Sequence, residues 1–219
     1  MASEPLPLAS ALAGESSLEE LNPGVAEVLD AALAQFEEIG IRRSTIEDIA
    51  RRAGIDRVTV YRRVGSKDDV IQGVIAREAR RLIAHVNAAT SPLPTLEQRI
   101  TTAFAATVLH IRRNALFNRM VALDGDTFLP RITTQASPLL AMGIAAAVGL
   151  LEQAQADGLL ELLSDPQEIS EILIRLVHSF ALTPDGAVKL QDRAALEQFA
   201  SRHLTPLVMG HGRPRASGD

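Results

Sequence analysis

The four residues Ala-Gly-Ile-Asp at positions 53–56 constrain this chain most, because they lie between two short helical patterns. Gly54 permits the left-handed backbone conformation that a tight turn between helices requires. Ile55 can fill the corner between the two helices, and Asp56 can cap the second one. Two short helices joined in this way predict a helix-turn-helix, whose second helix enters the major groove of DNA.

The flanking helices have their own start signals. Ser44 or Thr45 can cap the first helix, and Glu47 or Asp48 lies three residues later, where a capping box requires an acid. Ser66 can cap the helix after the turn in the same way. The signals at Ser44 or Thr45, Asp56 and Ser66 therefore predict three closely spaced helix starts between residues 44 and 67.

Helical periodicity continues through the rest of the chain, and no alternating pattern is long enough for a strand. Pro92 and Pro94 mark the clearest break between segments. The fold class is therefore predicted to be all-α. The other expected helices are 23–39, 67–89, 96–111, 115–123, 139–156, 168–182 and 192–209.

Charge is unevenly distributed in a chain whose net charge is -5. Residues 1–40 hold eight acidic residues and neither Lys nor Arg, whereas residues 41–81 hold eleven Lys or Arg and six acids. A basic segment in an acidic chain indicates a local electrostatic surface for a negatively charged partner. A solvated helix face with mixed charges is the alternative reading of charge alone.

Several function classes find no support in the sequence. The chain has no Cys, which excludes disulfides and Cys-ligated zinc, and its five histidines lack metal-ligand spacing. The glycines of "GIAAAVG" do not follow a strand, and neither a P-loop nor Gly-x-Ser-x-Gly occurs. The apolar run 138–151 is shorter than a membrane span, and the N-terminus is not a signal peptide. We expect a soluble cytoplasmic protein that is not an enzyme and needs no cofactor, metal or membrane.

The residues "TIEDIARRAGIDRVTVYRRVGSKDDV" at 45–70 resemble the DNA-binding domain of the tetracycline-repressor (TetR) family of transcriptional regulators. The matching elements are Thr-apolar-x-x-Ile-Ala, Ala-Gly-apolar, Thr-apolar-Tyr and Ser-Lys, at the right mutual spacing. The resemblance covers residues 25–87. Arg63 stands where the family often has an aromatic residue or His, and Val64-Gly65 stands where many members have Phe-Pro.

The resemblance implies roles for the matching positions. A recognition helix that reads bases would begin at Arg57, and a guanine is the base that an arginine reads best. Tyr61 and Lys67 would contact phosphates. The full set of expected DNA contacts is Thr45, Arg57, Val58, Thr59, Tyr61, Arg62, Arg63 and Lys67.

The family also implies a C-terminal half that dimerises and senses a ligand. The stripe of small residues in the apolar helix 139–156 suits close helix packing between two copies, and the alternative is an internal core helix of a monomer. Expected interface residues are Ala141, Ala145, Gly149, Ile172 and Leu176. Expected ligand-lining residues are Phe104, Thr107, His110, Phe117, Met120, Phe128 and Met142, although Phe and Met at helical spacing are more often core.

The predicted organisation has four parts. Residues 1–21 and 211–219 form disordered tails, 22–88 a helix-turn-helix DNA-binding domain, and 95–210 a helical ligand-binding and dimerisation domain. The predicted function is a homodimeric regulator of double-stranded operator DNA, a repressor released by a small, mainly apolar effector. A helical interaction or ligand-binding protein without a DNA role is the alternative, and an enzyme is a further one.

Overall fold

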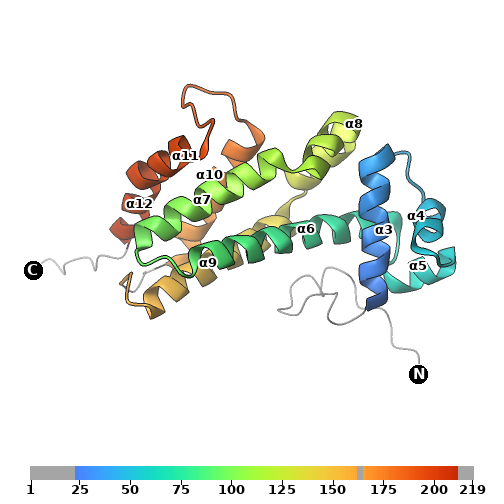
Figure 1. Cartoon of the computed structure of the whole chain (residues 1–219), viewed down its shortest axis with the longest axis horizontal. Coiled ribbons are helices and arrows are strands. Elements are labelled where there is room, and N and C mark those ends of the chain that lie inside the picture. Colours follow the sequence, from blue (N-terminus) through green and yellow to red (C-terminus); the bar gives the residue numbers. More distant parts are fainter. Residues whose placement is uncertain (1–22, 162–164, 212–219) are drawn as a thin grey trace, which may run out of the picture. The chain divides into compact units, whose positions relative to one another are not determined.

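A computed structural model describes residues 23–161 and 165–211, and every regular element in these two ranges is a helix (Figure 1). This confirms the predicted all-α fold. The expected tails lie outside the described residues, except for His211, which ends the last helix. The elements are α3 (Pro23–Ile39), α4 (Ile46–Ala53), α5 (Arg57–Arg63), α6 (Lys67–Thr90), α7 (Leu96–Arg113), α8 (Ala115–Ile132), α9 (Ser137–Ala156), α10 (Pro166–Leu182), α11 (Arg193–Phe199), the π-helical η1 (Ala200–Leu204) and α12 (Thr205–His211).

The described chain divides into two compact units, and the chain passes between them three times. The first unit contains residues 23–80 and 114–139, and the second contains 81–113, 140–161 and 165–211. The sequence led us to expect a single boundary between residues 88 and 95. Instead, α6 contributes to both units, and α8 groups with the helix-turn-helix rather than with the C-terminal half.

The first unit is built around α3, which packs against α4, α5 and α8. Val28, Phe36, Ile49, Val60 and Val70 are almost completely buried and come from four different helices. Such burial of large apolar side chains is the main stabilising contribution to a domain of this size. The helix-turn-helix therefore rests on a small core of its own.

Polar contacts join α8 to the rest of this unit. The sequence Asp124-Gly125-Asp126 was expected to end the helix after Leu123, but the helix resumes and continues to Ile132. Only Asp124 leaves helical geometry, with φ -139° and ψ 32°. Its buried carboxylate accepts hydrogen bonds from the backbone N–H of Ile41 at 2.5 Å and of Arg42 at 3.3 Å. The kink in α8 thus coincides with an anchor on the turn between α3 and α4.

Two further arginine contacts extend this anchor. Arg119 of α8 donates to the carbonyls of Glu37 and Glu38 at 3.1 Å each, near the C-terminus of α3. Arg131 forms an ion pair with Asp68 at 2.8 Å, in the first turn of α6. Residues 114–139 are therefore held to both helices that flank the helix-turn-helix.

The second unit is centred on α7, which packs against α10, α11, η1 and α12. Phe104 lies in its core, stacked on Phe199 at 5.8 Å and edge-on to Phe180 at 6.1 Å between ring centroids. Arg112 donates to the carbonyl oxygens of Phe180 and Leu190, which fixes the end of α10 and the segment that follows it. The helix expected over 192–209 is interrupted by the π-helical turn of η1.

α9 is the apolar helix of the second unit, yet little of it is covered. It has 20 residues, and by length and composition alone it is the one described helix that could cross a membrane. Only 11% of its apolar window is buried inside the chain. A core helix would be mostly buried, so this exposure calls for another explanation.

Candidate nucleic-acid interface

The second helix of the helix-turn-helix, α5, is fixed at its start by local sequence and along its inner face by core packing. The Asp56 side chain accepts from the backbone N–H of Thr59 at 2.8 Å and caps its start. Gly54 adopts φ 69° and ψ 25°, the left-handed conformation predicted for the turn. Val60 and Val64 are buried against the core. These contacts hold α5 in place while leaving its opposite face uncovered.

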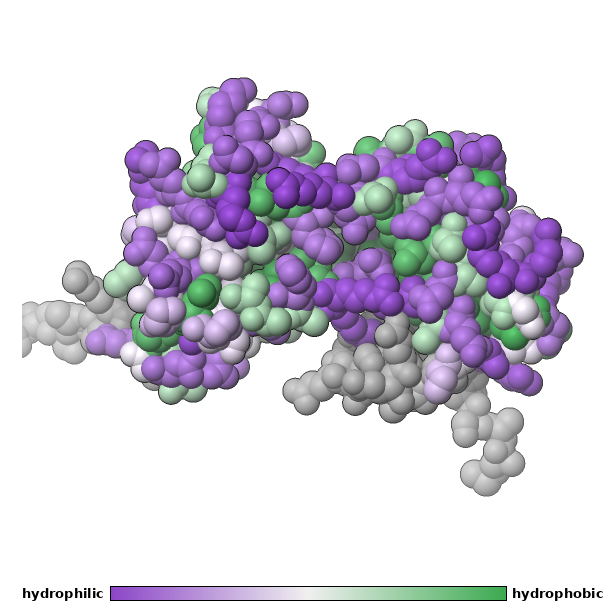
Figure 2. Space-filling model, viewed as in Figure 1, coloured by the Kyte–Doolittle hydropathy of each residue, from purple (hydrophilic) through white to green (hydrophobic). Residues whose placement is uncertain are grey.

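The uncovered face of α5 carries two arginines, the only tyrosine and a valine. The Val58 and Tyr61 side chains are 72% and 47% exposed, and the Arg57 guanidinium lies 5.7 Å from the centroid of the Tyr61 ring. Within the described residues, Arg57 and Arg62 form no ion pair or hydrogen bond, and the Tyr61 hydroxyl has no partner. Figure 2 shows the surface over α3–α5 as mainly hydrophilic on the face in view. This face offers charge and hydrogen-bonding groups without internal competitors.

Thr59 differs from its neighbours because its hydroxyl and backbone N–H both bond to the capping residue Asp56. Its hydroxyl donates to the Asp56 carboxylate at 2.7 Å, and the side chain is only partly exposed. The same hydrogen bonds from Thr59 lower the pKa of Asp56 below its usual 3.8. Thr59 is therefore placed to orient α5, and only its methyl group is free of these bonds.

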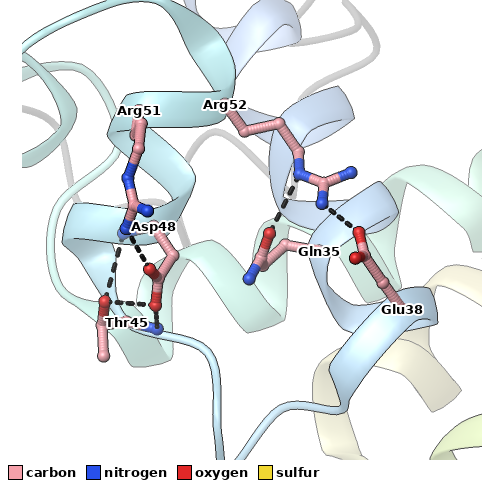
Figure 3. A network of polar contacts seen from close by, with 6 residues as sticks. All are labelled: Gln35, Glu38, Thr45, Asp48, Arg51 and Arg52. Atoms are coloured by element: carbon pink, nitrogen blue, oxygen red, sulfur yellow. Dashed lines mark hydrogen bonds and ion pairs between the residues drawn. The ribbon is translucent and has the colours of Figure 1, made fainter.

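Thr45 begins α4 with the capping box that the sequence predicts. Its hydroxyl oxygen accepts from the Asp48 N–H, while the Thr45 N–H donates to the Asp48 carboxylate, both at 3.1 Å (Figure 3). The hydrogen bond from the Thr45 hydroxyl lowers the pKa of Asp48. Arg51 pairs with this carboxylate, and Arg52 binds Gln35 and Glu38 of α3. Arg51 thus pairs within α4, and Arg52 joins α4 to α3.

Arg63 turns away from the exposed face of α5. Its guanidinium donates to the Gly24 carbonyl at 3.2 Å and pairs with Glu27 at 3.1 Å, both on α3. A Cβ added to Gly24 would lie 2.6 Å from the Arg63 Cζ, so the two helices meet closely here. Arg63 therefore joins the end of α5 to the start of α3.

Lys67, the first residue of α6, lies beside the turn between α3 and α4. Its ammonium donates to the Arg42 carbonyl at 3.4 Å. Burial lowers the pKa of Lys67, and the nearby carboxylates of Asp124 and Asp68 partly oppose this effect. The ammonium thus sits between the α3–α4 turn and the start of α6.

Two residues of this region were missed by sequence reasoning. Arg42 is exposed in the α3–α4 turn, three residues before Thr45, and its only described ion pair is with the exposed Asp126. Asp124 holds the same turn from α8, 83 residues away. The pair "RR" just before the capping Thr could have indicated Arg42, whereas no local signal points to Asp124.

The structure separates the seven expected ligand-lining residues. Phe117, Met120 and Phe128 belong to the first unit, where Met120 and Phe128 are core residues. The other four belong to the second unit; they are Phe104, Thr107, His110 and Met142. Phe104 is core, and the exposed His110 lies 6.3 Å from His85 between ring centroids. No group of three or more His, Asp or Glu side chains in residues 23–161 and 165–211 could hold a metal ion.

The expected interface residues all belong to the second unit, on α9 and α10. Ala141, Ala145 and Gly149 of α9 are exposed, and a Cβ added to Gly149 would meet nothing within 4 Å. Ile172 and Leu176 of α10 are partly exposed. The stripe of small residues is therefore open.

Comparison with known proteins fits this geometry. Residues 28–74 match the family described as bacterial regulatory proteins, tetR family. This chain is a TetR-family transcriptional regulator. It is 27% identical over 171 residues to the HTH-type transcriptional regulator AlkX of Mycobacterium tuberculosis, covering 77% of each protein. It is 29% identical over 163 residues to the HTH-type transcriptional repressor BepR of Brucella suis, covering 70% of this chain and 76% of BepR.

The fold of this TetR-family regulator also matches a solved structure. The TetR family repressor AlkX from Dietzia sp. strain DQ12-45-1b superposes with a TM-score of 0.65 at 19% identity, covering 86% of this chain and 97% of that one. The family match supports DNA-binding transcriptional regulation, and α5 is the second helix of the helix-turn-helix.

Proposed function

We propose that this regulator acts as a homodimeric repressor, which places two copies of α5 in successive major grooves of an operator. The observation that carries the proposal is the exposed face of α5, where Arg57, Tyr61 and Arg62 have no competing ion pair or hydrogen bond among the described residues. An unpaired guanidinium loses little on leaving water if it binds a phosphate or a guanine edge. Two recognition helices would then be separated by about 34–36 Å, or a multiple of that distance.

The expected DNA contacts can be sorted into base contacts and phosphate contacts by position on α5 and by the hydrogen bonds that each side chain already makes. Arg57, Val58 and Thr59 open α5 and would face base edges, whereas Tyr61, Arg62 and Lys67 would bind phosphates. Thr45 would bind a phosphate by exchanging the hydrogen bond that its hydroxyl donates to Asp48 for one to the phosphate. Arg63 leaves the set expected from sequence, because a phosphate would have to compete with Glu27 and the Gly24 carbonyl. Arg42 joins it as a phosphate contact, since its exposed pair with Asp126 costs little to break.

The homodimer would form through α9 and α10. Ala141, Ala145 and Gly149 present a surface on which a second helix could approach closely, and α9 is mostly uncovered in the single chain. An apolar face of this length is costly to leave in water, and a second copy of the chain would cover it with the same face. Ile172 and Leu176 would pack at the same interface.

A mainly apolar effector would bind the second unit, with Thr107, His110 and Met142 as the expected lining that lies outside its core. The structurally similar repressor AlkX from Dietzia is implicated in biodegradation of n-alkanes, so n-alkanes are the first compounds to test. An effector acts only through its different affinity for two conformers. α8 could transmit a change in the second unit to the helix-turn-helix. The chain continues from both ends of residues 114–139 into the second unit, while Asp124 of α8 holds the α3–α4 turn.

The test is a titration of the purified chain against the DNA upstream of its own gene, followed by fluorescence anisotropy at several salt concentrations. We expect preference over random duplex, a linear fall of log affinity with log salt, and a complex of two chains per site. Arg57→Ala should lose roughly ten-fold or more in affinity and relax the preference at one base. Equal affinity for random and upstream DNA would refute the repressor assignment.

A further inference from the structure

Val58 is an unusual residue to find on the exposed face of α5. It is the most exposed large hydrophobic side chain in the described part of the molecule, at 72%. It lies one helical turn before Arg62 and next to Arg57, so charged and hydrogen-bonding side chains surround it. The apolar spot is small, and it sits within the set of side chains that would face DNA.

The neighbouring Thr59 does not duplicate this apolar spot. Its hydroxyl and N–H both bond to Asp56, which fixes the side chain against the cap, and it is less exposed than Val58. Val60 is fully buried in the core. Val58 is therefore the one aliphatic side chain of α5 that can reach a partner without moving the helix.

A duplex major groove offers one apolar group to such a side chain. Adenine, guanine and cytosine present hydrogen-bond donors and acceptors there, whereas thymine also presents its C5-methyl group. The positive charges of Arg57 and Arg62 beside Val58 favour the approach of this face to the negatively charged duplex. We infer that Val58 contacts a thymine methyl group in each half-site and makes that thymine a determinant of specificity. The inference rests on the proposed reading of DNA by α5.

The test first obtains a binding sequence from a random duplex library, with the full-length chain as the selecting protein. Each thymine of the selected duplex is then replaced by deoxyuridine, which removes only the methyl group. Replacement of this thymine in one half-site only should weaken binding about four-fold, the equivalent of losing burial of one methyl group. Replacement in both half-sites should weaken binding about fifteen-fold, because the two contacts are independent.

The variant Val58→Ala shows whether the loss of affinity on replacing thymine by deoxyuridine depends on the Val58 side chain. The variant should bind thymine and deoxyuridine duplexes within two-fold of each other, and its melting temperature should be unchanged because the side chain is exposed. Val188→Ala is the matched control, since Val188 is 48% exposed and belongs to the other unit. It should keep the full four-fold penalty.

The outcomes separate this inference from the proposed function. Enrichment of no sequence at all would refute DNA reading by α5. Enrichment of a sequence that tolerates deoxyuridine at every thymine, or a penalty that Val58→Ala retains, would leave DNA binding intact and overturn the role of Val58.

Discussion

The buried carboxylate of Asp124 gives the sharpest prediction about stability. It is 3% exposed and accepts hydrogen bonds from the backbone N–H groups of Ile41 and Arg42. Hydrogen bonds to a charged group contribute about 1.5–3 kcal/mol, and a buried N–H left without a partner costs about as much. Asp124→Ala should therefore lower the free energy of unfolding of the first unit by about 3 kcal/mol. Asp124→Asn keeps one acceptor oxygen and should cost about half of that.

The control is Asp126→Ala, only two residues away on α8. Asp126 pairs with Arg42, but both side chains are largely exposed, at 70% and 64%. An exposed ion pair contributes at most about 1 kcal/mol, so this variant should be nearly as stable as the wild type.

Urea unfolding followed by circular dichroism would compare the variants. Hydrogen exchange at the Ile41 amide would report the local opening directly, with faster exchange in Asp124→Ala. If Asp124→Ala were no less stable than Asp126→Ala and the Ile41 amide stayed protected, the carboxylate would not be holding the turn.

Further substitutions test the roles of Arg63, the two capping carboxylates and α9. Arg63→Ala should lower the free energy of unfolding by about 1 kcal/mol and change the DNA affinity of the folded protein little. Arg62→Ala should leave stability unchanged and weaken DNA binding. A large loss of DNA affinity in folded Arg63→Ala would show that Arg63 is a phosphate contact after all. The pKa values of Asp48 and Asp56 are lower in the folded chain than their usual 3.8, so the ionised carboxylates stabilise the fold at pH above 3.8. This stabilisation is lost as the pH falls through the pKa values of the folded chain. The urea midpoint of the double variant Asp48→Asn/Asp56→Asn should therefore fall less steeply on acidification than that of the wild type. Ala145→Arg should yield monomers by light scattering at concentrations where the wild type is dimeric, since a charge on α9 would face a second copy; an unchanged mass would remove α9 from the interface.

The helix-turn-helix could be predicted from sequence because its signals are local. Thr45 and Asp56 bond within three residues of themselves, so a cap can be recognised from spacing alone. The left-handed turn at Gly54 is equally local. Each of these predictions is confirmed by the structure.

The long-range contacts were beyond reach for a physical reason. Arg63 looked like a phosphate contact because nothing in the sequence places it near Glu27, 36 residues earlier. Likewise, the sequence after Leu123 resembles a helix end, because a Gly between two Asp residues disfavours a helix. Only the folded unit supplies the N–H groups that compensate for the non-helical backbone at Asp124.

The polar contacts between α8 and the rest of the first unit affect how an effector could change the conformation of the helix-turn-helix. The described contacts of Asp124, Arg119 and Arg131 with α3, the α3–α4 turn and α6 are directional hydrogen bonds and ion pairs. Such contacts weaken steeply as a donor and acceptor lose alignment, whereas apolar packing tolerates small sliding. A displacement of α8 by about 1 Å would then weaken its hold on the α3–α4 turn, whose Arg42 carbonyl accepts a hydrogen bond from the Lys67 ammonium. We therefore expect effector-induced changes in hydrogen exchange to begin at Ile41 and Arg42, before any change at the buried Val60 of α5.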